Sequence, residues 1–131
     1  MILVFGGAYS GKLKFAIEKY NLKEEDIFTI NNEGIDEIDF SKKVIYKLHN
    51  LTYKYALDNE DIVKYFKDNI NLFKDKIIIC DDISEGIVPL KKEDRVWRET
   101  TGKLLQEISR EANEVYRVFC GIPMEIKKWK N

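Results

Sequence analysis

A glycine-rich loop near the start of the chain constrains the fold more than any other sequence feature. An apolar run from Ile2 to Phe5 leads into GGAYSGK at residues 6–12, which matches the pattern GxxxxGK. Apolar residues at helical spacing follow between Leu13 and Tyr20, so we expect a helix over about residues 11–20. Because this pattern binds phosphate where it connects a strand to a helix, the sequence predicts a phosphate-binding loop.

The spacing of this motif has a physical basis. A loop that wraps a phosphate turns its backbone N–H groups inward, and glycine permits the required dihedral angles and the close approach. The following helix adds free N–H groups and the positive end of its dipole, while Lys12 reaches the β- and γ-phosphates. The expected nucleotide contacts are Gly6, Gly7, Ala8, Tyr9, Ser10, Gly11, Lys12 and Leu13. The alternative is a glycine-rich turn that binds no ligand.

The residue after Lys12 departs from the full motif. The pattern places Ser or Thr there, whose hydroxyl group binds Mg²⁺, and this chain has Leu13. The sequence therefore supports phosphate binding more strongly than phosphoryl transfer.

Length and composition exclude several classes of protein. A chain of 131 residues suits one domain, which we expect to span residues 1–131. The 22 basic and 23 acidic residues nearly cancel, which argues against a nucleic-acid or anionic membrane partner. No apolar run approaches the roughly 18 residues of a membrane span, and none resembles a signal peptide, so we expect a cytoplasmic protein.

Metal-binding and redox residues are scarce. Cys80 and Cys120 each end an apolar run and have no CxxC spacing, so we expect reduced, buried thiols. His49 is the single histidine, which argues against a zinc site.

Strand and helix patterns alternate along the chain. Expected strands lie at residues 2–5, 26–30, 43–48, 76–80 and 114–120, with a helix capped by Asp58 that runs to Phe73 and another over 92–112. Residues 31–41 and 83–89 are expected to be loops, Gly121 to Pro123 to break the last strand, and the Lys-rich residues 127–130 to be a solubilising terminus. This alternation predicts an α/β fold: a P-loop NTPase-like (RecA-like) three-layer domain with a mainly parallel sheet.

An acidic pair follows the most apolar interior strand. Asp81 and Asp82 come directly after KIIIC at residues 76–80, a run typical of a buried parallel strand. Ligands bind at the carboxyl ends of strands in open α/β sheets, so the pair is expected near the phosphate loop. We favour Asp82 as the metal or substrate contact; the alternatives are a helix cap or a solvated turn.

These residues together resemble the bifunctional adenosylcobinamide kinase/adenosylcobinamide-phosphate guanylyltransferase family of cobalamin assembly. GGAYSGK at residues 6–12 is close to the family's GGARSGKS, and CDDISEGIVP at residues 80–89 is close to SNEVGxGIVP. A further similarity to the family's FRDxxGxxNQ is found in Trp97-Arg98-Glu99 with Gly102 and Gln106. Residues 121–123 match the family's GIP.

The resemblance implies an ATP- or GTP-dependent kinase that acts on the aminopropanol hydroxyl of adenosylcobinamide and then transfers GMP through a covalent histidine intermediate. It also implies a homo-oligomer. In this scheme Lys12 is catalytic and stabilises charge on the transferred group, and Asp82 is catalytic as the match to the family's Glu, where it holds Mg²⁺ or orients the hydroxyl.

The chain departs from the family pattern in two further places. The family's histidine lies in a segment HxxxRPxxW, whereas residues 31–43 contain no His, Arg or Trp, and His49 lies after the third predicted strand without the RPxxW that follows. We expect His49 to be a surface or helix-start residue, with a nucleophile as the alternative. Lys47 replaces an acidic residue of the family, where it would repel a metal or neutralise phosphates directly.

Three hypotheses remain open. The first is a nucleotide-binding kinase of cobalamin biosynthesis that has lost guanylyl transfer. The second is an inactive module that binds nucleotide or a corrinoid such as adenosylcobinamide, and the third is an interaction scaffold. Nothing in the sequence indicates a preference for ATP or GTP.

Overall fold

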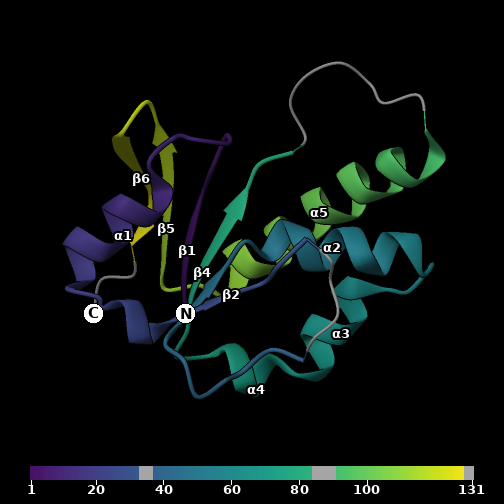
Figure 1. The fold of residues 1–131 in the computed structure, drawn as a ribbon, viewed down its shortest axis with the longest axis horizontal. Coiled ribbons are helices and arrows are strands. Elements are labelled where there is room, and N and C mark those ends of the chain that lie inside the picture. The colour runs from purple at the N-terminus through teal and green to yellow at the C-terminus, as the bar shows by residue number, and fades with distance from the viewer. Residues whose placement is uncertain (33–36, 84–90, 129–131) are drawn as a thin grey trace.

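The computed structural model describes residues 1–32, 37–83 and 91–128. Its strands form one sheet in the order β2-β3-β4-β1-β5-β6 (Figure 1). The strands are β1 (Ile2–Gly6), β2 (Ile27–Thr29), β3 (Val44–Tyr46), β4 (Ile77–Asp81), β5 (Glu114–Phe119) and β6 (Ile122–Lys128). All neighbouring pairs are parallel except β5 and β6, which are antiparallel. The predicted mainly parallel α/β sheet is confirmed.

Helices cover both faces of this sheet (Figure 1). The helices are α1 (Lys12–Tyr20), α2 (Leu48–Leu57), α3 (Ile62–Asp68), α4 (Ile70–Phe73) and α5 (Lys92–Glu111), with a 3₁₀ turn η1 (Glu24–Asp26). Helix α1 packs on one face through Ala16, while α2 and α5 pack on the other through Leu48 and Leu104. The three-layer P-loop-type architecture predicted from the sequence is confirmed. Among the described residues, no helix is long and apolar enough to span a membrane.

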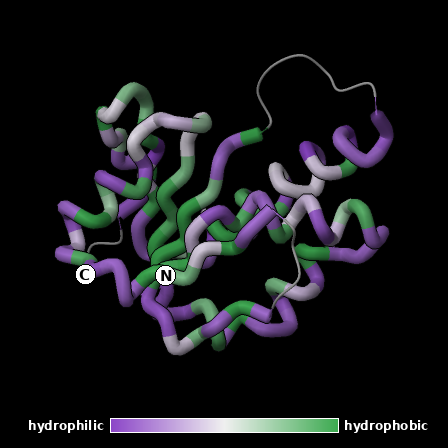
Figure 2. Tube along the Cα trace, viewed as in Figure 1, coloured by the Kyte–Doolittle hydropathy of each residue, from purple (hydrophilic) through white to green (hydrophobic). Residues whose placement is uncertain are grey.

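Strand β4 shows why the centre of the sheet is so apolar. Ile77 and Ile79 pack with the α1 layer, whereas Ile78 and Cys80 pack with the opposite layer, so both faces are buried. In Figure 2 the apolar colours accordingly concentrate in the central strands. Cys80 is a free, buried thiol, as predicted, and burial raises its pKa. Cys120 is exposed in the β5–β6 turn with φ 49°, so the prediction of a buried thiol there is wrong.

The chain between β3 and β4 differs most from the sequence prediction. The strand expected over residues 43–48 is only Val44–Tyr46, and Leu48 already begins α2, which was not predicted. Lys47 connects them in the left-handed conformation, with φ 65° and ψ 48°. No glycine or proline marks this turn, so the sequence pattern does not reveal it.

The helix expected from Asp58 to Phe73 is divided in two. Asp58 is the carboxyl-terminal cap of α2, whereas Asp61 caps α3 by accepting a hydrogen bond from the backbone N–H of Lys64 at 3.1 Å. Asn69 then separates α3 from α4. Both helices still turn their aromatic residues toward the core, because Phe66 and Phe73 are buried with ring centroids 5.0 Å apart.

The end of the chain forms a strand rather than an irregular tail. A turn at Cys120 and Gly121, both with positive φ, reverses the chain, and β6 pairs with β5 from Ile122 onward. Pro123 is tolerated because β6 is an edge strand. Of the loop expected at 83–89 only Ile83 is described, and of the Lys-rich residues 127–130 only Lys127 and Lys128, which belong to β6. Residues 33–36 of the polar connector lie outside the described residues.

Candidate phosphate-binding site

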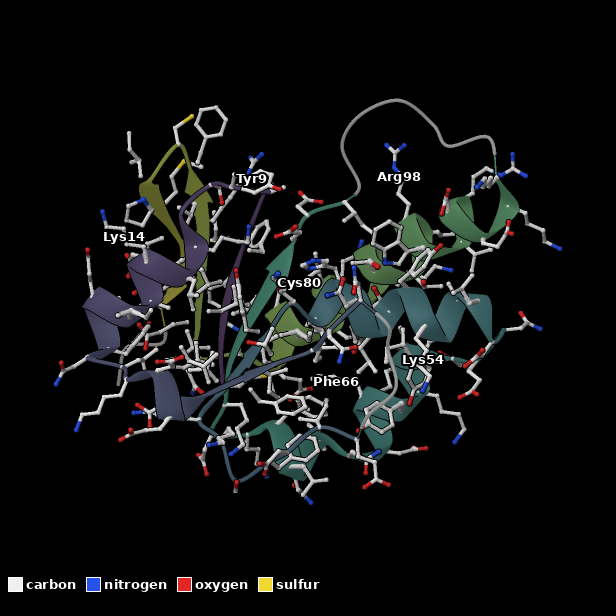
Figure 3. The ribbon with its side chains drawn as sticks, in the orientation of Figure 1. Tyr9, Lys14, Lys54, Phe66, Cys80 and Arg98 are labelled. Carbon is white, nitrogen blue, oxygen red and sulfur yellow. The ribbon has the colours of Figure 1, made fainter. Side chains whose placement is uncertain are left out.

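The carboxyl ends of β1, β3 and β4 lie beside one another in the sheet, and a cavity of about 450 Å³ opens there. It is lined by residues 8–14 of the loop and α1, by Tyr46 and Lys47 after β3, by His49 of α2 and by Asp81 at the end of β4. Figure 3 labels Tyr9 near the tip of the loop and Lys14 on α1. The fold thus places the predicted phosphate loop across the cavity from basic, aromatic and acidic side chains.

The loop has the backbone conformation that its glycines permit. Gly11 adopts φ 92° immediately before α1, and Tyr9 adopts φ 60° with a fully exposed side chain. The backbone N–H of Ser10 donates to the Gly7 carbonyl at 3.3 Å. The Ser10 carbonyl in turn accepts a hydrogen bond from the N–H of Gly121 at 2.8 Å. The β5–β6 turn therefore holds the loop on the β5 side of β1, whereas Asp81 of β4 lines the cavity on the other side.

Lys12 is buried beneath this loop, with 6% of its side chain exposed. Its Nζ donates to the Gly7 carbonyl at 2.7 Å and forms an ion pair with Oδ1 of Asp81 at 2.7 Å. It also lies 3.5 Å from the Ser10 hydroxyl. The positive charge predicted to meet phosphate is thus held inside the cavity by a carboxylate.

The acidic residue brought to Lys12 is Asp81, whereas Asp82 is the contact predicted from the sequence. The pleat of β4 contains the signal that was missed: Ile77, Ile79 and Asp81 alternate onto the same face as α1, which begins with Lys12. Asp82 lies one residue beyond the strand, where its backbone N–H donates to the Gly6 carbonyl at 2.7 Å. This hydrogen bond extends the β1–β4 pairing to the start of the loop.

His49 completes the polar contacts of Asp81. Its Nδ1 accepts a hydrogen bond from the Asp81 backbone N–H at 3.0 Å, and its Nε2 lies 3.5 Å from Oδ2 of Asp81. Burial lowers the pKa of His49; Asp81 opposes this shift, and Lys12 and Lys47 add to it. Because Nδ1 accepts this hydrogen bond, the geometry assigns the ring proton to Nε2. His49 lies in the first turn of α2, which confirms the helix-start position, and 13% of its side chain is exposed.

A cluster of hydrogen-bonded polar side chains from α2 and α5 contacts the backbone of His49. Trp97 of α5 donates its indole N–H to the His49 carbonyl and to the Thr52 hydroxyl, both at 2.9 Å. The hydroxyl groups of Thr52 and Thr101 are 2.7 Å apart, and both residues are fully buried. The start of α2 is thereby fixed to α5.

The comparison with protein families fits this arrangement. The family model for cobinamide kinase / cobinamide phosphate guanyltransferase matches residues 42–126, which is more than half of the chain. The chain belongs to this family. No curated protein matches the chain. Family membership supports a cobinamide kinase/guanyltransferase-like role in cobalamin biosynthesis, with a nucleotide as substrate.

The match to the cobinamide kinase family covers one wall of the cavity and not the other. It includes Lys47, His49, Asp81 and the α5 residues that support them, from β3 to most of β6. The phosphate loop at residues 6–12 precedes the matched span, so its assignment depends on its own motif and geometry.

We predict that Thr52→Val destabilises the protein by about 1–3 kcal/mol. The substitution keeps the shape of the side chain but removes a hydroxyl that contacts the His49 carbonyl, Trp97 and Thr101. Urea unfolding followed by circular dichroism measures the loss. Thr100→Val is the matched control, since the Thr100 hydroxyl bonds to carbonyl groups of its own helix. Equal losses in the two variants would contradict the importance of the cluster.

Proposed function

We propose that this chain binds the triphosphate of ATP or GTP in the phosphate loop and transfers the γ-phosphoryl group to the aminopropanol hydroxyl of adenosylcobinamide. The observation that carries this proposal is the position of Lys12, whose Nζ is buried in the cavity that residues 8–14 line. Lysine at this position of GxxxxGK reaches the β- and γ-phosphates in proteins that use the motif. The family's kinase activity supports the choice of acceptor.

In the proposed reaction, the phosphate oxygens accept hydrogen bonds from the loop N–H groups and from Lys12. An incoming phosphate competes with Asp81, so Lys12 exchanges a carboxylate partner for a phosphate partner. Its charge then stabilises the negative charge that develops on the transferred group. We assign to Asp82, which follows β4 at the same edge of the sheet, the role of orienting the acceptor hydroxyl.

We further propose that the chain does not transfer GMP. A histidine nucleophile must direct a free nitrogen lone pair at the α-phosphate. Nδ1 of His49 already accepts the Asp81 N–H, and the proton on Nε2 faces the carboxylate of the same residue. The absence of an HxxxRPxxW segment from the sequence supports the same conclusion.

Labelled nucleotides test both halves of the proposal. With γ-phosphate-labelled ATP or GTP, we expect label to appear in adenosylcobinamide phosphate, and with α-phosphate-labelled GTP we expect no label on the protein or on a corrinoid product. The acceptor-free reaction is the control. A protein that binds nucleotide yet forms no phosphorylated corrinoid would contradict the kinase assignment.

A second candidate is a nucleotide-binding module without chemistry. The ion pair between Lys12 and Asp81 favours it if the pair persists when nucleotide binds, because Lys12 then does not stabilise the transferred group. Leu13, which lines the same cavity, supplies no hydroxyl group. Nucleotide binding without turnover in the labelling experiment would favour this module over the kinase.

A further inference from the structure

Phosphoryl transfer from nucleotides ordinarily uses Mg²⁺, so the cavity's donor groups decide whether such an ion fits here. Mg²⁺ requires oxygen ligands in near-octahedral geometry. Asp81 is the one carboxylate among the described residues that line the cavity. Its Oδ1 is 2.7 Å from Nζ of Lys12, and its Oδ2 faces Nε2 of His49 at 3.5 Å. Both oxygens are therefore directed at donors rather than toward open space.

Several other groups of the cavity oppose a divalent cation, and the Ser10 hydroxyl lies 3.5 Å from Nζ of Lys12. Leu13 contributes hydrocarbon where the motif supplies a hydroxyl ligand, and Lys14 and Lys47 add positive charge. Three lysines thus line a cavity whose one described carboxylate is already paired with Lys12. This donor set does not fit Mg²⁺.

Lys47 is the residue best placed to supply the positive charge that Mg²⁺ would otherwise supply. It ends the β3 segment in a left-handed conformation, and the next residue begins α2, so its side chain enters the cavity beside the amino end of that helix. Its Nζ lies 5.5 Å from the ring centroid of Tyr46, which also lines the cavity. A cation–π contact of this kind orients an ammonium group without neutralising it.

We infer that this cavity binds polyphosphate without a divalent cation, with Lys47 supplying the positive charge that Mg²⁺ supplies elsewhere. The inference rests on the proposed nucleotide site and specifies its ligand: the metal-free polyphosphate chain of a nucleoside triphosphate. Lys12 lies beneath the loop, Lys47 follows β3 and Lys14 belongs to α1, and all three line the cavity. The amino ends of α1 and α2 add their dipoles to the same space.

Calorimetric titration with ATP, GTP and inorganic tripolyphosphate, each in EDTA and in excess Mg²⁺, tests the inference. We expect the unaltered protein to bind in EDTA at least as tightly as in Mg²⁺. Lys47→Asn removes the charge while keeping a residue that tolerates positive φ, and we expect binding about tenfold weaker in EDTA. Lys47→Glu introduces a second carboxylate, and we expect binding that is lost in EDTA and partly restored by Mg²⁺.

Lys74→Asn is the matched control for charge. Lys74 is exposed and precedes β4, at the edge of the sheet away from the cavity, so its loss should leave all titrations unchanged. Thermal unfolding of each variant verifies that it is folded. Binding by the unaltered protein only in Mg²⁺, or no effect of Lys47→Asn, would overturn the inference and leave the proposed nucleotide site standing. No binding under either condition would overturn both.

Discussion

Gly6→Ala is expected to destabilise the protein by at least about 3 kcal/mol, because the added methyl group has no space. Gly6 ends the central strand β1 with φ 155°, and a Cβ built there would overlap the carbonyl oxygen of Val118. That carbonyl belongs to β5, whose pairing with β1 fixes its position. The carbonyl of Gly6 is also held, by the N–H of Asp82 at 2.7 Å. Neither strand can move aside without losing these hydrogen bonds.

Urea unfolding followed by circular dichroism measures this effect, with Gly7→Ala as the control. The two glycines are adjacent in the loop, but a Cβ at Gly7 meets no atom within 4 Å. We therefore expect Gly7→Ala to change stability by less than about 0.5 kcal/mol. Similar stability of the two variants would contradict the close approach of β1 and β5.

Lys12→Ala is expected to weaken nucleotide binding about a hundredfold. A charged hydrogen bond contributes about 1.5–3 kcal/mol, and here the donor is already positioned in the cavity by Gly7.

Asp81→Asn is expected to strengthen nucleotide binding, since it removes both the partner that holds Lys12 and a negative charge near the phosphates. We expect about tenfold tighter binding, equivalent to about 1.4 kcal/mol.

Titration with a fluorescent nucleotide measures the dissociation constants of the two single variants and of the double variant Lys12→Ala/Asp81→Asn. The double variant removes the ion pair completely, so it leaves no uncompensated carboxylate beside the loop. Lys64→Ala serves as the control, because its ion pair with Asp68 lies on the surface, with 72% and 58% of the two side chains exposed. Unchanged affinity after loss of Lys12 would place the nucleotide elsewhere.

The central architecture could be predicted from the sequence because its signals are strong and local. The loop motif lies between an apolar run and a helical pattern, and β4 is apolar on both faces because both faces are buried. Helix α5 keeps one apolar stripe, so its expected range of 92–112 differs from the observed Lys92–Glu111 by one residue.

The remaining elements depend on tertiary contacts that the pattern does not carry. Helix α2 begins after a left-handed lysine rather than a glycine, and β6 is held by its pairing with β5 rather than by its own mostly exposed side chains. In the site, the structure places Lys12 in the cavity beneath the loop, and its predicted role in phosphate binding stays a prediction. Asp81 was passed over because two adjacent acids cannot be distinguished without the pleat of β4, and the burial of His49 requires α5 packed behind it.

The position of β1 has a consequence for the order in which the protein takes shape during synthesis. Ile2 pairs with Ile77 on one side and with Glu114 on the other, so β1 waits for partners that are synthesised much later. The loop that follows β1 also accepts a hydrogen bond from Gly121, which is translated after strands β1 to β5. Pairings of such long sequence separation slow folding. The residues that would receive the ligand are thus made well before the partners that complete their geometry.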